Sequence, residues 1–90
     1  MRYGVAGPLR WQEFDGEWVV YCTTTGALQA ADAVTAAVLS VIECAPASID
    51  DVVSQVAAST GVASTPGLRA GMSVLLDELQ RIGMVQALWP

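Results

Sequence analysis

The sequence predicts a single α+β domain in which a small antiparallel sheet precedes three helices. Two runs of strand-forming residues flank Asp15-Gly16, a dipeptide that favours a tight hairpin turn because both central positions need positive φ. Further along the chain, apolar residues recur at helical spacing, most clearly between Leu68 and Ile82. Strands at the start of a chain and helices after them are typical of α+β folds, and this order matches a winged-helix-like domain whose hairpin comes first.

The hairpin is predicted to join Leu9–Phe14 to the run "EWVVYCTTT" that starts at Glu17. Both faces of the second strand carry large residues, which indicates a central strand that is partly covered on each side. A turn at Thr25-Gly26 then leads into a short third strand, Ala27–Ala31. The sheet therefore has three strands, and the third lies at its edge. The tryptophans of the hairpin, Trp11 and Trp18, are expected to pack on the core or on the sheet.

Three helices follow, and each is preceded by a residue whose side chain accepts hydrogen bonds from a first helical turn: Asp32, Ser48 and Thr65. These caps predict helices from Ala33 to Cys44, from Ile49 to a stop at Gly61, and from Pro66 to a stop at Gly83. Helical spacing then predicts the residues that face the core: Val34, Ala37, Val38, Val41, Ile42, Ile49, Val52, Val53, Val56, Leu68, Met72, Leu75, Leu76, Leu79 and Ile82.

The two ends of the chain carry weaker signals. We expect residues 1–8 to be a flexible N-terminal segment of a single domain that spans residues 1–90. Met84–Leu88 fits either a terminal strand or a segment packed on the core, and the pattern does not decide between them. Cys22 and Cys44 are expected to be buried free thiols of a cytoplasmic protein, since no framework of further cysteines surrounds them.

Composition excludes several functions. Nine acidic residues against four arginines give a net charge of −5, the wrong sign for a surface that must neutralise phosphates, so we expect no nucleic-acid partner. Histidine is absent and there are two cysteines, so no zinc-type ligand set, metal site, cofactor or catalytic residue is expected. The longest uncharged stretch, Val52–Leu68, contains several polar residues and proline, so we expect no membrane span.

Several stretches resemble the PqqD family of small peptide chaperones, also called RiPP recognition elements: Trp11, "VVY" at 19–21, "TG" at 25–26, "AAVL" at 36–39 and "LLDELQRIGMV" at 75–85. The likeness covers the chain from Leu9 onward and is greatest for the branch of systems that contain a kinase related to HPr kinase. One departure lies in the third strand, where that branch carries a histidine followed by leucines and this chain has Gln29, Ala30 and Ala31.

The resemblance implies a function for the third strand. Members of the family bind the leader segment of a precursor peptide as an additional strand at this edge, with the third helix as the other wall. They then present the peptide to a modifying enzyme, which is a radical SAM enzyme in the namesake pathway. By this resemblance, the partners would be a precursor or leader peptide and either a radical SAM enzyme or an HPr-kinase-related protein.

The residues themselves suit this role. Small side chains in the third strand would let a guest backbone approach, and no proline or lysine guards the edge. On the third helix, Val74 lies away from the core stripe, on the same flank as a glycine and a charged pair. The predicted peptide-binding residues are Ala27, Leu28, Gln29, Ala30, Ala31, Gly71, Val74, Glu78 and Arg81. In the simpler interpretation, the alanines only fit beneath the helices and Gly71 only permits close helix packing.

The sequence thus predicts a non-enzymatic, cytoplasmic peptide chaperone that is a monomer or a weak homodimer. Two alternatives stay open at this point. One is a winged-helix nucleic-acid-binding or transcription module that uses the third helix for recognition, although that helix lacks the basic face usual in such readers. The other is a structural subunit that dimerises or docks through the same edge strand.

Overall fold

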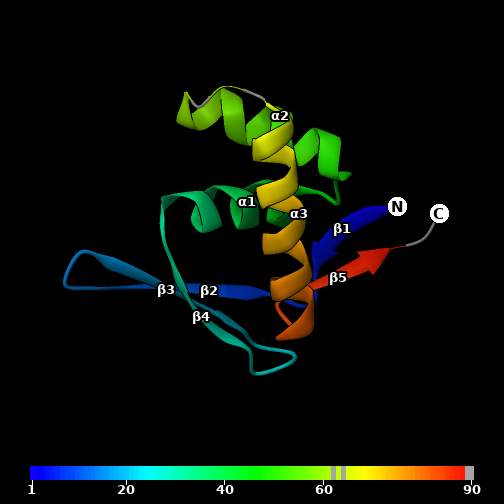
Figure 1. Cartoon of the computed structure of the whole chain (residues 1–90). Helices are drawn as coiled ribbons and strands as arrows, with labels where there is room; N and C mark the ends of the chain where they lie inside the picture. The colour runs from blue at the N-terminus through cyan, green and yellow to red at the C-terminus, as the bar shows by residue number, and fades with distance from the viewer. Residues whose placement is uncertain (62, 64, 89–90) are drawn as a thin grey trace.

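A computed structural model describes residues 1–61, 63 and 65–88 of the chain. Its elements follow the order β1 (Arg2–Val5), β2 (Leu9–Phe14), β3 (Glu17–Cys22), β4 (Leu28–Ala31), α1 (Ala33–Cys44), α2 (Ile49–Thr60), α3 (Pro66–Arg81) and β5 (Val85–Leu88) (Figure 1). The fold is α+β, with a three-stranded antiparallel sheet in the order β2-β3-β4 and three helices. The predicted α+β class, with a three-stranded antiparallel sheet and three helices, is confirmed.

The predicted hairpin is present with its expected turn. Asp15 and Gly16 have φ values of 52° and 82°, the positive values that a type I′ turn requires. β2 and β3 pair in register from Phe14 opposite Glu17 to Leu9 opposite Cys22. Since β3 also pairs with β4, it is the central strand, as predicted.

Residues 2–5 form a strand, β1, within the stretch over residues 1–8 that the sequence predicts to be flexible. Strand β1 pairs antiparallel with β5, from Arg2 opposite Leu88 to Val5 opposite Val85 (Figure 1). On its other side, Tyr3 donates its amide to the carbonyl of Ala47 at 2.7 Å and accepts from the Ala47 amide at 3.0 Å. The Tyr3 side chain is buried, so it anchors the strand to the core. The undecided segment at the C-terminus is therefore a strand.

The core is formed by one face of the main sheet, the three helices and the β1-β5 pair. Its fully buried side chains are Val20, Cys22, Val38, Leu39, Ile42, Val52, Val56, Leu76, Leu79, Met84 and Val85. Most of the predicted helical core residues are buried or half-buried. In α1, however, the buried stripe is Thr35, Val38, Leu39 and Ile42, whereas Val34 is exposed. This helix is apolar on several faces, and tertiary packing selects the face that contains Thr35.

The two cysteines differ in burial. Cys22 is fully buried in the sheet, whereas Cys44, the last residue of α1, is exposed. The expectation of two buried thiols is therefore wrong for Cys44.

A side-chain contact ties the main sheet to α3. The hydroxyl of Thr25, in the turn between β3 and β4, donates to the carbonyl of Gly83 just after α3, at 2.6 Å. Gly83 has a φ of +90°, a backbone conformation that residues other than glycine rarely adopt. This contact holds the start of β4 near the end of α3, so the helix runs beside the strand (Figure 1).

Among residues 1–61, 63 and 65–88, no helix combines the length and the apolar character needed to cross a bilayer.

Candidate functional site

Strand β4 offers an edge with open hydrogen-bonding groups. In the described part of the chain it pairs with β3 alone. The Cys22 amide donates to the Ala27 carbonyl at 2.8 Å, so these two residues form a hydrogen-bonded pair of the ladder. Hydrogen-bonded and non-hydrogen-bonded pairs alternate along an antiparallel ladder, so Gln29 and Ala31 also face β3. Leu28 and Ala30 therefore direct their N–H and C=O groups away from the sheet.

The side chains of β4 leave this edge accessible. Leu28 is 65% exposed, Ala30 is exposed, and Gln29 and Ala31 are half-buried. Ala27 differs from these four, because its side chain belongs to the core and its carbonyl is bonded to Cys22. Of the five predicted strand residues, Leu28 to Ala31 thus form the accessible edge, and Ala27 supports it from within.

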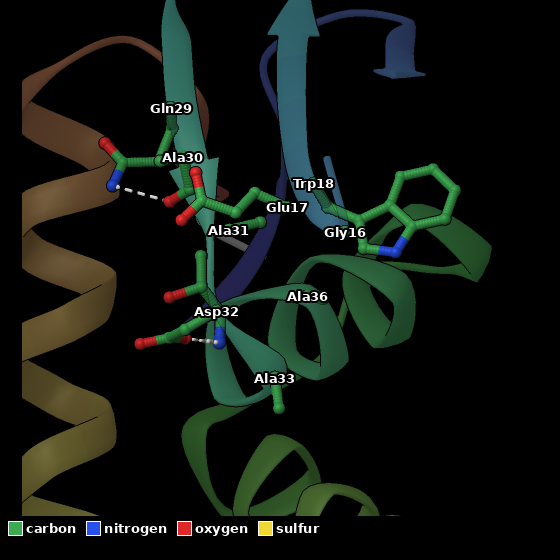
Figure 2. A pocket seen from close by; sticks show the side chains of 10 residues that line it. Gly16, Glu17, Trp18, Gln29, Ala30, Ala31, Asp32, Ala33 and Ala36 are labelled. Carbon is green, nitrogen blue, oxygen red and sulfur yellow. Dashed lines mark hydrogen bonds between the residues drawn. The ribbon is translucent and has the colours of Figure 1, made fainter. Parts of the chain in front are cut away.

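One edge group already has an internal partner. The side-chain amide of Gln29 donates from Nε2 to the carbonyl oxygen of Ala30 at 3.1 Å (Figure 2). That carbonyl is one of the outward-facing groups, so Gln29 caps it from the same strand. A strand added to this edge would have to share the Ala30 oxygen with Gln29 or displace its amide.

The predicted residues of α3 are exposed, and none of them lines the hollow at the end of β4. Val74 is 65% exposed, and a Cβ added to Gly71 would meet open space. Arg81 donates to the Glu78 carboxylate at 2.6 Å. This hydrogen bond and the nearby positive charge lower the pKa of Glu78, and the same contact raises the pKa of Arg81, so the pair stays ionised. α3 runs beside β4 in both views, but none of these four residues lines the hollow described next (Figures 1 and 2).

A hollow of about 610 Å³ lies where β4, the hairpin and α1 meet (Figure 2). Part of its wall comes from β4 and the residue after it, which supply Gln29, Ala30, Ala31 and Asp32. The rest comes from the end of the hairpin and the first turn of α1, with Gly16, Glu17, Trp18, Ala33, Thr35 and Ala36. The hollow thus continues from the C-terminal end of the open edge.

Trp18 was not predicted from the sequence to belong to this site. As predicted, Trp18 packs on the sheet, against Trp11 of the neighbouring strand, but it is also 43% exposed and lines the hollow. Trp11 and Trp18 pack edge to face, with ring centroids 6.5 Å apart, and Trp11 donates from Nε1 to Glu43 at 3.3 Å. A second hollow of about 330 Å³ lies beside this pair and is lined by Trp11, Trp18, Ala36 and Ser40. The nearby Asp15-Gly16 turn was the available signal, because side chains next to a hairpin turn lie at the end of a sheet.

Asp32 links the hollow to the start of α1. Its carboxylate accepts a hydrogen bond from the Thr35 amide at 2.7 Å, which is the N-cap contact that the sequence predicts. Hydrogen bonds from Thr35 lower the pKa of Asp32, so this carboxylate is ionised throughout the neutral range.

Replacing Asp32 by alanine is expected to lower the free energy of unfolding by about 1 kcal/mol at neutral pH, the usual cost of a lost N-cap. The folded-state pKa of Asp32 is depressed, so its contribution is present above the unfolded-state pKa of about 3.9 and disappears as the pH falls through the folded-state value. Urea denaturation of both proteins over a range of pH values would measure this. A difference that grows on acidification would contradict the assigned cap.

The described residues contain no group of three or more His, Cys, Asp or Glu side chains placed to hold a metal ion. The arrangement is instead suited to binding through main-chain groups, with an acidic and aromatic hollow at one end. Comparison of the chain with models of protein families, with curated proteins and with solved structures gives no match in any of the three.

Proposed function

We propose that this domain is a non-catalytic peptide chaperone that takes an extended precursor or leader segment as an additional strand on β4. The observation that carries the proposal is the open edge, on which the N–H and C=O groups of Leu28 and Ala30 face outward and the side chains stay accessible. Such an edge supplies affinity through main-chain hydrogen bonds, while the side chains around it select the peptide.

The C-terminal tail supports this proposal by its position. Strand β5 pairs with β1, at the other sheet, so within the described residues the tail does not occupy β4. Strand β4 also lacks proline and lysine, two residues that commonly block an edge against pairing. An edge with unpaired main-chain groups and no blocking residue is suited to pairing with an added peptide strand.

The resemblance to the PqqD family supplies the rest of the proposal. By that likeness, the bound peptide is presented to a modifying enzyme, either a radical SAM enzyme or an HPr-kinase-related protein. We place the complex in the cytoplasm and expect the free domain to be a monomer or a weak homodimer. The charge balance of −5 disfavours nucleic acid as the partner.

A display library of random 12-residue peptides would test the proposal. Peptides retained by the immobilised domain would be synthesised and mixed with it, and amide hydrogen exchange would be followed residue by residue. We expect new protection at Leu28 and Ala30, whose amides face outward in the free protein. Protection confined to other elements would contradict strand addition, as would light scattering that shows a stable dimer held through β4.

Replacing Gln29 by alanine is expected to strengthen peptide binding, by up to about fivefold. The substitution removes the side-chain amide that occupies the Ala30 carbonyl, and one hydrogen bond contributes about 1 kcal/mol net. Calorimetry with a selected peptide would measure the change. Gln12→Ala is the matched control, because Gln12 is an exposed glutamine on β2, the strand at the opposite edge of the sheet from β4. Weaker binding by Gln29→Ala alone would mean that Gln29 contacts the guest instead of competing with it.

A further inference from the structure

Two acidic side chains, Glu17 and Asp32, line the hollow at the end of β4. Two more contact or face the tryptophans of the hairpin, since Glu13 lies opposite Trp18 in the hairpin and Glu43 accepts a hydrogen bond from Trp11, the ring neighbour of Trp18. Asp15, in the hairpin turn, adds a fifth carboxylate at the same end of the sheet. The formal charges of these side chains make this end of the sheet negative.

All of the chain's basic side chains lie elsewhere. Two of the four arginines are in surface ion pairs, Arg69 with Asp50 at 2.9 Å and Arg81 with Glu78 at 2.6 Å. Arg2 is in β1, at the second sheet. Arg10 lies opposite Tyr21 in the ladder, whereas Glu17 lies opposite Phe14, so Arg10 is toward the other end of the hairpin from the hollow. Among the described residues, no salt bridge joins an arginine to Glu17 or Asp32.

Asp32 lies beside the point where a guest strand on β4 would continue, and Glu17 is the neighbour of Asp32 on the β3 side. Trp18 is opposite Ala31 in the ladder, so one step further the same register sets Glu17 against Asp32. A guest that pairs with the outward groups of Leu28 and Ala30 would reach this point about two residues later. In Figure 2 the Glu17 side chain extends toward Ala30 and Ala31, whereas the Trp18 ring extends the other way.

The hollow also has an apolar wall suited to a long cationic side chain. The Trp18 ring is 43% exposed, and Ala33 and Ala36 of α1 leave space because their side chains are small. Lysine and arginine bury their aliphatic stems against such surfaces while the charged head meets a carboxylate, and an indole face attracts a cation in addition.

We infer that this hollow binds a lysine or arginine side chain of the guest peptide, located about two residues beyond the part that pairs with Ala30. The inference rests on the proposed function for the identity of the partner. Glu17 and Asp32 supply the opposite charge, and Trp18 supplies the apolar wall. The arrangement fixes the register of the guest, since its basic residue must lie at the hairpin end of β4.

The first test uses isolated side chains and requires no strand addition. N-acetyl-arginine amide would be titrated into the ¹⁵N-labelled protein, with N-acetyl-citrulline amide as the neutral probe of the same shape. We expect a saturable shift of the Trp18 indole N–H and of the Glu17 and Asp32 amides with the arginine probe only. Binding should weaken at high salt, because exposed charges are screened. Equal shifts from the two probes would overturn the inference.

Variants give the second test. Glu17→Gln with Asp32→Asn removes both charges, and asparagine remains a good N-cap, so the fold of α1 is retained. We expect about tenfold weaker binding of the arginine probe to this double variant. Asp77→Asn, an exposed acid on α3, is the control for a loss of charge elsewhere. A double variant that binds the probe as well as the control does would overturn the inference.

Selected peptides separate this inference from the proposed function. Display against the native protein should enrich a basic residue at one end of the captured segment, and display against the double variant should not. Peptides that pair with β4 but show no such enrichment would overturn the inference and leave strand addition intact. A probe that binds in the hollow, with no peptide captured on β4, would support the cation site and refute the proposed function.

Discussion

Replacing Leu76 by alanine is expected to lower the free energy of unfolding by about 2–5 kcal/mol, the range found when a buried leucine is truncated and leaves a cavity. Leu76 is fully buried on the core-facing side of α3. A domain of this size has a total stability of about 5–15 kcal/mol, so the loss would remove a large part of it. Urea denaturation followed by circular dichroism would give the value, with the slope of the transition as a check on two-state behaviour.

Val74→Ala on the same helix is the matched control. Val74 is 65% exposed, so its truncation should change the free energy of unfolding by no more than about 0.5 kcal/mol. Alanine also has the higher helix propensity, which favours a small gain. If the two substitutions lowered the free energy of unfolding equally, α3 would not bury the face that contains Leu76.

Elements marked by local signals were predictable from the sequence. The Asp15-Gly16 turn fixes the register of β2 and β3, because a two-residue loop with positive φ joins adjacent strands. The caps Asp32, Ser48 and Thr65 all accept hydrogen bonds from their first helical turns, so the three helices begin where the sequence predicts. In each case the determining atoms lie within four residues of one another.

The second sheet was not predictable in this way. Strand β1 has four residues and pairs with residues 85–88, at the opposite end of the chain. No turn connects the two strands, so the sequence near either strand contains no signal that predicts their pairing. What holds β1 is the burial of Tyr3 and its two main-chain bonds to Ala47, both of which depend on the assembled core.

The candidate site also combines a feature that the sequence predicts with features that depend on tertiary packing. The order of the strands was enough to predict that β4 is an edge, and four of its five named residues are accessible. The contribution of Glu17 and Trp18 depends on how the end of the hairpin lies relative to the first turn of α1. That placement is tertiary, and the alternation of residues in β3 does not encode it.

Replacing Ala30 by proline is expected to weaken peptide binding by at least about tenfold, or about 1.4 kcal/mol, while the domain stays folded. The ladder directs the Ala30 amide away from β3, so proline removes a donor that only a guest strand would use. Its ring also occupies space that a guest backbone needs. Proline is tolerated on edge strands where the missing amide faces solvent, so the sheet should survive.

Two further variants, one at Ala30 and one at Gln29, show whether the loss of binding comes from the missing Ala30 amide. Ala30→Gly keeps the amide and should bind a selected peptide within about threefold of the native protein, since it alters only a small exposed side chain. Gln29→Pro instead removes an amide that faces β3, and it should destabilise the sheet itself because a ladder hydrogen bond is lost. Calorimetry gives the affinities, and thermal unfolding separates loss of binding from loss of fold. If Ala30→Pro were folded and bound the peptide as tightly as Ala30→Gly, the guest would have to lie elsewhere than on the edge of β4.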